Sequence, residues 1–216
     1  MSWDAVIFDC DGTFVDSERI GNEVLVEHAK RFGVALTVEE AIARFRGVRM
    51  AECVSQLEVL RGSSLPSTFV TEFREWMREA FISRLRPMDG AAELLGSLVV
   101  PCCVASSGPR EKTEFSLSVT GLLAHFEGKV FSSYEVNHWK PDPGLFLHAA
   151  SVMGVVPERC AVIEDSLPGV RAGVAAGMAV FAIVADKLEN DMPQEVRVVA
   201  HLREVHEIFR TAGIAL

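Results

Sequence analysis

Basic residues, long apolar runs and paired cysteine motifs are all scarce in this sequence. Its 216 residues contain 21 Lys and Arg against 30 Asp and Glu, which gives a formal net charge of -9. Such a chain lacks the basic face that nucleic acid or an anionic membrane requires, so neither is expected as a partner. Any phosphate group that it binds must be held by a few local cations.

No apolar run approaches the roughly 18 to 20 residues that a membrane-spanning helix requires. The sequence begins MSWDAVIFDCDG, without the basic region or small-residue cleavage site of a secretory signal. We therefore expect a soluble, cytoplasmic protein. The five cysteines show none of the CxxC spacings of zinc or redox sites, so buried and reduced thiols are expected.

The composition is that of a folded domain, with 49% apolar and 24% charged residues. Short apolar runs rich in β-branched residues are typical of strands and occur at Ala5–Phe8, Val99–Ala105, Cys160–Ile163 and Met178–Val184. Helix-like segments separate the later runs, which predicts an α/β fold with a Rossmann-like parallel sheet. A polar loop over 188–194, a last short strand and a helix over 204–212 are expected to follow.

The strand pattern is interrupted between Asp16 and about Leu85, where apolar residues recur at helical spacing. Gly33, Gly47 and the stretch GSSLP at 62–66 are typical of helix ends and turns. The simplest account is a helical cap domain inserted after the first strand. The predicted domains are an α/β core of residues 1–15 and 86–216 and a cap of residues 16–85.

The strongest functional signal is the motif DCDGT at 9–13, directly after the first predicted strand. Open α/β sheets bind ligands beyond the carboxyl ends of their strands. Residues two apart in an extended chain point to the same side, so Asp9 and Asp11 could address one reacting atom. Gly12 then lets the chain turn. Taken alone, the motif is also typical of an acidic turn that ends a strand.

Three further groups of polar residues follow predicted strands or begin predicted helices. They are Ser106-Ser107-Gly108, Lys140 within KPDP, and Glu164-Asp165-Ser166 followed by Gly169. Each group alone is more typical of a helix cap or a solvated surface residue. Parallel strands bring such groups to a common edge, so their combination favours one shared site.

The order Asp-x-Asp, Ser, Lys, Glu-Asp resembles the haloacid dehalogenase superfamily along the whole chain. The insert after the first motif is similar to the helical cap of the subgroup that contains β-phosphoglucomutase and small sugar phosphatases. The stretches FDCDGTFVDSE, SSGPREK and HWKPDPGLF look like those of bacterial sugar-phosphate phosphatases, including those that act on 6-phosphogluconate. This resemblance implies a phosphatase whose partner is a small phosphorylated metabolite; no pattern indicates an oligomeric state.

The resemblance also implies catalytic roles. Asp9 would attack the phosphoryl group and form an aspartyl phosphate, which water then hydrolyses. Asp11 would act first as the acid and then as the base. Ser106 and Lys140 would hold the transferring oxygens, and Thr13 would orient Asp9.

The family pattern implies Mg²⁺ as the cofactor, because all the available ligands are oxygen atoms. Its ligands would be Asp9, the backbone carbonyl of Asp11, Asp165, and Glu164 directly or through water. Contacts with the substrate are expected from Thr13, Ser107, Gly108, Glu18, Asn22, Arg46 and Gly47. Arg46 with Glu18 and Asn22 would suit hydroxyl or carboxylate groups, unless the arginines around Gly47 only solvate a helix junction.

Other chemistries of related proteins fit less well. Dehalogenases lack the second aspartate of the first motif, so Asp11 indicates transfer of a phosphate ester. Phosphoglucomutase-type transfer on a sugar phosphate is the main alternative, but that branch has a cap histidine where this chain has Gly21. His28, further along, is interpreted as packed or solvated. A phosphoacceptor signalling module would lack the helical insert, and a silent binding protein would lack the nucleophile or the lysine.

Overall fold

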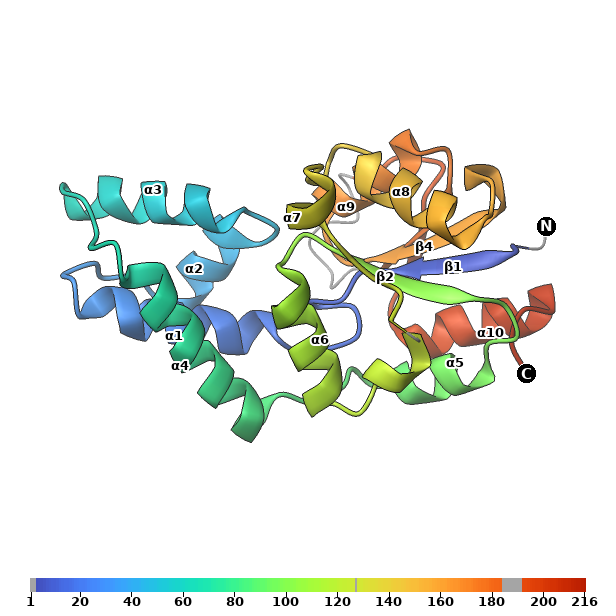
Figure 1. Cartoon of the computed structure of the whole chain (residues 1–216), viewed down its shortest axis with the longest axis horizontal. Helices are drawn as coiled ribbons and strands as arrows, with labels where there is room; N and C mark the ends of the chain where they lie inside the picture. Colours follow the sequence, from blue (N-terminus) through green and yellow to red (C-terminus); the bar gives the residue numbers. More distant parts are fainter. Residues whose placement is uncertain (1–2, 127, 184–191) are drawn as a thin grey trace. The chain divides into compact units, whose positions relative to one another are not determined.

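A computed structural model describes residues 3–126, 128–183 and 192–216 of the chain (Figure 1). The chain divides into two compact units: residues up to Val15 together with Pro87–Leu216, and Asp16–Arg86. The helical unit therefore ends one residue beyond the predicted boundary at 85. Among the described residues, no helix is both long and apolar enough to cross a membrane.

A six-stranded sheet forms the centre of the first unit, as far as this unit is described, with the order β3-β2-β1-β4-β5-β6. Its strands are β1 Ala5–Phe8, β2 Cys102–Ser106, β3 Val130–Ser132, β4 Cys160–Glu164, β5 Ala179–Ile183 and β6 Arg197–Val199. Every neighbouring pair is parallel, which confirms the predicted fold class. The chain moves outward from β1 to β3 and then crosses to β4. The point where the strand order reverses therefore lies between β1 and β4, where such sheets bind ligands.

Helices cover both faces of this sheet (Figure 1). They are α5 Ala91–Ser97, α6 Arg110–Val119, α7 Ser133–Val136, α8 Gly144–Met153, α9 Leu167–Ala175 and α10 Leu202–Ala212, with short 3-10 turns at Leu123–Phe126 and Pro157–Arg159. In β1, Ala5 and Ile7 belong to the apolar cluster formed with α8 and α9. Phe8 contacts Phe14 with ring centroids 4.4 Å apart. Burial of all four residues of β1 explains why the strand reads as a continuous apolar run.

Two details of the sheet differ from the sequence prediction. The second strand begins at Cys102 rather than Val99, because Pro101 has no N–H for a ladder bond. The Val99 N–H instead donates to the carbonyl of Ile214 at 3.0 Å. Strand β3 was not predicted, since three residues are too short for a recognisable pattern. The end of the predicted strand at Val184 and most of the predicted polar loop lie outside the described residues.

The second unit consists of helices around a core of their own. Its helices are α1 Glu18–Lys30, α2 Val38–Phe45, α3 Met50–Arg61 and α4 Phe69–Arg84. Thr37 begins α2 with a reciprocal capping box to Glu40. His28 is fully buried, and its ring lies 4.5 Å from the ring of Phe69, centroid to centroid. The core of this unit therefore contains aromatic residues of its own helices and no residue of the sheet.

Candidate active site

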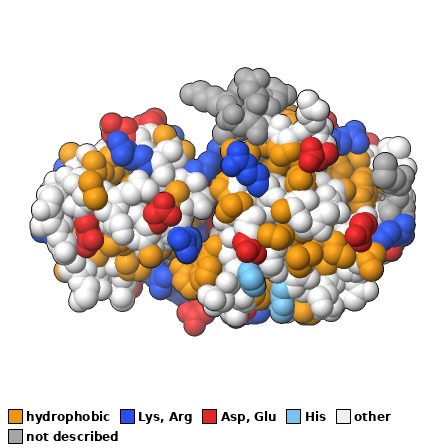
Figure 2. Space-filling model, turned by 90° about the horizontal axis from the view of Figure 1, so that it is seen from above, with side chains coloured by type: hydrophobic (Ala, Val, Ile, Leu, Met, Phe, Trp, Pro, Cys, Tyr) orange, Lys and Arg blue, Asp and Glu red, His pale blue; other side chains and the backbone are white. Residues whose placement is uncertain are grey.

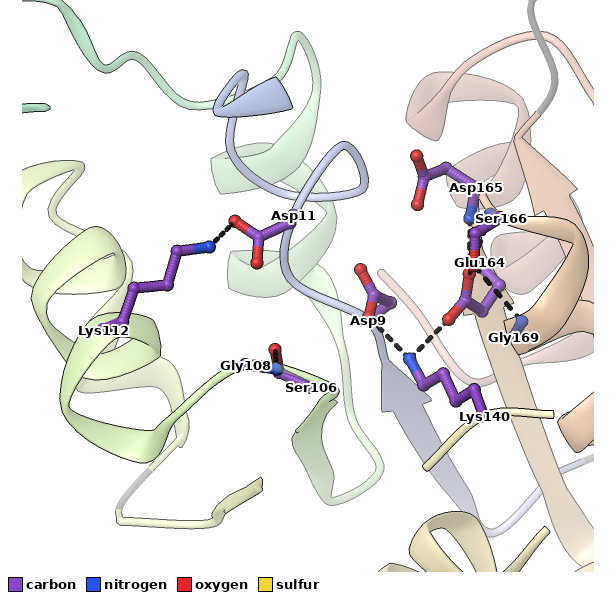
Figure 3. Close-up of polar contacts among 10 residues, drawn as sticks. All are labelled: Asp9, Asp11, Ser106, Gly108, Lys112, Lys140, Glu164, Asp165, Ser166 and Gly169. Carbon is purple, nitrogen blue, oxygen red and sulfur yellow. Dashed lines mark hydrogen bonds and ion pairs between the residues drawn. The ribbon is translucent and has the colours of Figure 1, made fainter. Parts of the chain in front are cut away.

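The register of the central strands brings three polar positions to one edge of the sheet (Figure 3). Phe8 is level with Val104 of β2 and Ile163 of β4. Asp9 follows Phe8, and its backbone N–H donates to the carbonyl of Ile163 at 2.9 Å. The carboxyl ends of β1, β2 and β4 therefore present Asp9, Ser106 and Glu164 together, as the positions of the motifs predicted.

Lys140 is a buried cation between two of these strand ends. Its ammonium group donates to Oδ1 of Asp9 at 2.6 Å and also to Oε1 of Glu164. Only 4% of the Lys140 side chain is exposed. It does not follow a strand directly, because α7 lies between the end of β3 and the loop that carries Lys140 into α8. The Phe146 ring of α8 lies 4.9 Å from the ammonium nitrogen, so protein groups hold this charge from several sides.

Glu164 is fixed by hydrogen bonds to both of its carboxylate oxygens. Oε1 accepts from Lys140, while Oε2 accepts from the backbone N–H of Asp165 at 3.0 Å and of Ser166 at 2.9 Å. The Ser166 hydroxyl donates to Oε2 at 2.9 Å and accepts from the N–H of Gly169 at 3.2 Å, which caps α9. A Cβ at Gly169 would clash with the Glu164 carboxyl group, so a glycine is required there.

Three carboxylates gather beside the single ammonium of Lys140. One oxygen each of Asp9, Glu164 and Asp165 lies within 4.8 Å of the other two, and all three residues are buried. Gly12 has φ +79, and a Cβ there would clash with the Asp165 carboxylate. The three acids exceed the charge of Lys140 by two negative charges. An oxygen-only, doubly negative cluster of this kind fits a hard divalent cation such as Mg²⁺.

The charge balance also perturbs the pKa values of the cluster. Burial raises the pKa of Asp9 to about 7; the Lys140 ammonium opposes this rise, while the Glu164 and Asp11 carboxylates add to it. Burial alone would lower the pKa of Lys140, but the Asp9 and Glu164 carboxylates raise it overall. Lys140 therefore stays charged, and a divalent cation among the acids would favour the ionised form of Asp9.

Ser106 ends β2 and is braced by the neighbouring strand. Its hydroxyl oxygen accepts from the backbone N–H of Gly108 at 3.0 Å. The Ser132 hydroxyl, at the end of β3, donates to the carbonyl of Gly108 at 2.7 Å. Ser106 is buried, whereas Ser107 and Gly108 are half-buried. The loop into α6 is thus held at the same edge as Asp9.

Asp11 forms an ion pair with Lys112 of α6, a residue that the sequence analysis did not select. Figure 3 shows Asp11 and Lys112 on one side of Asp9, and Lys140 and Glu164 on the other. Lys112 stands in the first turn of its helix, where a positive charge is unfavourable next to the helix dipole. That position is the signal that could have pointed to a nearby acidic partner.

The remaining predicted residues are not part of this cluster. Thr13 is fully buried, and within the described structure its hydroxyl makes no hydrogen bond, so its orienting role stays a prediction. Glu18, Asn22, Arg46 and Gly47 lie in the helical unit. Arg46 Nη2 donates to Glu18 Oε2 at 2.5 Å, and Asn22 Nδ2 donates to the Glu18 carbonyl at 2.8 Å. These two contacts join Arg46 and Asn22 to Glu18.

The raised pKa of Asp9 gives a stability prediction. Because this pKa, about 7, lies above the usual 3.8, the native state binds more protons, and the free energy of unfolding should fall as pH rises between these values. Asp9→Asn carries no charge, so without divalent cations we expect it to be more stable than the wild type at about pH 8, by on the order of 2 kcal/mol. This gain should shrink as pH falls below about 7, where Asp9 of the wild type takes up a proton.

Urea unfolding in excess chelator, at about pH 8 and again at a pH well below the raised pKa of Asp9, measures this difference in the free energy of unfolding. Asp89→Asn is the matched control, because Asp89 is an exposed acid paired with Arg203 and its loss should give no such gain. If the free energy of unfolding has the same pH dependence in wild type and Asp9→Asn, the pKa of Asp9 is not raised in the native state.

Known proteins similar to this chain identify its family. Residues 3–177 match the model of the haloacid dehalogenase-like hydrolases. The chain is 37% identical over 212 residues to the 6-phosphogluconate phosphatase of Escherichia coli (strain K12), with 97% of this chain and 96% of that protein covered. It is 30% identical over 206 residues to hexitol phosphatase A of the same organism, with 92% and 90% covered.

Solved structures agree. A HAD family hydrolase from Deinococcus radiodurans R1, determined with bound phosphate and sodium, has a TM-score of 0.78 and 28% identity, with 99% of this chain and 97% of that chain covered. A haloacid dehalogenase-like protein of unknown function from Agrobacterium tumefaciens has a TM-score of 0.82 and 26% identity, with 98% and 100% covered. The resemblance inferred from the motif order is confirmed. The chain belongs to the haloacid dehalogenase-like hydrolases and is a phosphoric monoester hydrolase.

Proposed function

We propose that this enzyme is a Mg²⁺-dependent phosphatase of a phosphorylated sugar or sugar acid, such as 6-phosphogluconate, and that it works through a phosphorylated Asp9. The observation that carries the proposal is the contact of Lys140 with Asp9 at 2.6 Å beside two further buried carboxylates. A carboxylate cannot approach a phosphate dianion unless cations offset the repulsion between them. This cluster supplies one cation and has the ligands for a second.

In the proposed reaction a carboxylate oxygen of Asp9 attacks phosphorus while the bond from phosphorus to the substrate oxygen breaks. Asp11 gives a proton to the departing oxygen. It then removes a proton from water, whose oxygen bonds to phosphorus as the bond to Asp9 breaks. Lys140 and the Ser106 hydroxyl would stabilise the charge on the transferring oxygens. Mg²⁺, held by Asp9, Asp165 and the Asp11 carbonyl, would neutralise the remaining charge.

The contacts of Glu164 support the proposal that it does not bind the metal directly. Both of its oxygens already accept hydrogen bonds from Lys140, Ser166 and the backbone N–H of Asp165. A direct bond to the cation would compete with these donors. We therefore propose that Glu164 holds Lys140 and reaches Mg²⁺ through water, and that Asp165 is the stronger ligand.

The proposed substrate class rests on the relatives and on Arg46. One relative is a 6-phosphogluconate phosphatase and another a hexitol phosphatase. Arg46 is paired with the Glu18 carboxylate at 2.5 Å, so its guanidinium is positioned to bind a carboxylate, and a sugar acid could take the place of Glu18. A mutase is less well supported, because Gly21 has no side chain for proton transfer and the one histidine of α1, His28, is packed in the core of the helical unit.

The first prediction of this function concerns the two aspartates of the first motif. Asp9→Asn should reduce hydrolysis of p-nitrophenyl phosphate to below about one per cent of wild type, because the amide cannot attack phosphorus. Asp11→Asn should still accept a phosphoryl group from this good leaving group but hydrolyse the aspartyl phosphate slowly. A rapid-quench measurement should therefore detect a burst of p-nitrophenol. An active Asp9→Asn, or an Asp11→Asn with an unchanged steady-state rate, would contradict the assigned roles.

Metal dependence is the second prediction. Chelation should stop hydrolysis and added Mg²⁺ should restore it. Asp165→Ala should raise the Mg²⁺ concentration for half-maximal activity strongly, and Glu164→Ala less, with thermal unfolding used to check that each variant is folded. Full activity in excess chelator would show that no divalent cation is needed, and an equal shift for both variants would remove the distinction between these acids.

The third prediction tests the substrate class. Arg46→Ala should raise KM for 6-phosphogluconate by roughly ten- to a hundredfold, because a charged partner of the carboxylate is lost. Hydrolysis of p-nitrophenyl phosphate, which has no carboxylate, should barely change. Arg44→Ala, in the last turn of α2, removes the same charge nearby and is the matched control. Equal effects on both substrates, or none, would leave Arg46 as a surface charge.

A further inference from the structure

The ion pair between Lys112 and Asp11 has no place in the roles described above. Lys140 already supplies the cation beside Asp9, and Lys112 binds the other aspartate of the motif. The Lys112 side chain is 22% exposed and that of Asp11 32%, so much of the pair is removed from solvent. The lysine is therefore a partly buried neighbour of the proposed acid and base and is paired with its carboxylate.

The position of Lys112 is fixed by the elements around it. It lies in the first turn of α6, and the loop that leads into this helix is held by Ser106 and Ser132 through Gly108. Arg110, two residues earlier, instead binds Glu135 of α7 through two hydrogen bonds of 2.6 and 2.7 Å. Two basic residues of the same helical turn thus have different partners: Arg110 pairs with Glu114 and Glu135, and Lys112 pairs with Asp11.

We infer that Lys112 is a positioning residue for Asp11. Its ammonium holds Oδ1 of Asp11, so the proton given to the departing oxygen, and later taken from water, is carried by Oδ2. The oxygen held by Lys112 accepts a hydrogen bond in both protonation states of the carboxyl group. One geometry therefore serves both steps. This inference rests on the proposed phosphatase reaction and adds a residue to it.

Lys112 acts through Asp11 rather than on the phosphoryl group. In Figure 3 its ammonium reaches the Asp11 carboxylate from the side away from Asp9 and Lys140. A direct contact with the transferring phosphoryl group would place it beside Asp9, where Lys140 already lies. The two lysines thus have separate tasks, one on the nucleophile and one on the acid and base.

The test is pre-steady-state kinetics of Lys112→Met with p-nitrophenyl phosphate and 6-phosphogluconate. With p-nitrophenyl phosphate, which leaves without a proton, we expect a burst of p-nitrophenol at the wild-type rate. A steady state roughly 10- to 100-fold slower should follow, because the misplaced Asp11 activates water poorly. With 6-phosphogluconate both steps need Asp11, so kcat should fall by a similar factor without a burst. Lys112→Arg should restore part of the rate.

A double variant separates positioning from direct contact. In an Asp11→Asn background, Lys112→Met should cause no further loss, because both changes disable the same group. Arg110→Met removes one positive charge from the same helical turn and should leave the kinetics unchanged. A lost or slowed burst, or a full further loss in the Asp11→Asn background, would overturn the inference and indicate contact with the substrate.

Unchanged kinetics of Lys112→Met would also overturn it. The phosphatase reaction is measured separately by wild-type turnover and its loss in Asp9→Asn. A negative result at Lys112 with that turnover intact would therefore contradict the positioning role alone.

Discussion

The buried ammonium of Lys140 is the interaction on which the rest of the site depends. It lies between Asp9 and Glu164, and removing the lysine alone would leave both carboxylates buried without their shared cation. Such a cluster is tolerated only because its remaining acceptors are satisfied. The two backbone N–H groups and the hydroxyl that bind Oε2 of Glu164 do this at the start of α9. Ser166 thus both caps α9 and helps to hold Glu164, the partner of Lys140.

The parallel sheet explains why such distant residues meet. Lys140 and Asp9 are separated by 131 residues, yet their side chains meet at the same edge of the sheet. Strands β1 and β4 lie side by side at the point where the strand order reverses, so the acids that follow them converge. Gly12 and Gly169 then remove the two Cβ atoms that would keep the Asp165 and Glu164 carboxylates away from the neighbouring turns.

Most of this arrangement could be predicted from the sequence because it depends on strand ends. A buried parallel strand reads as an apolar run, and the residue after it must lie at the ligand edge, which locates Asp9 and Glu164. Side-chain pairs that form only through tertiary packing leave no comparable pattern in the sequence. Lys112 reaches Asp11 across 101 residues, and its only local sign was an unfavourable charge in a first helical turn. Strand β3 was missed because it lies at the edge of the sheet and has only three residues, which is too short for a recognisable strand pattern.

Each of the two units has an apolar core of its own. The helical unit has its own aromatic core, in which Nε2 of His28 donates a hydrogen bond to the Phe69 carbonyl at 3.1 Å, and burial lowers the pKa of this histidine. Packing, not proton transfer, accounts for that residue. This core includes none of the sheet residues. In the proposed reaction, phosphoryl transfer depends on residues at the strand ends, whereas the proposed substrate contact Arg46 belongs to the helical unit, which packs around a core of its own.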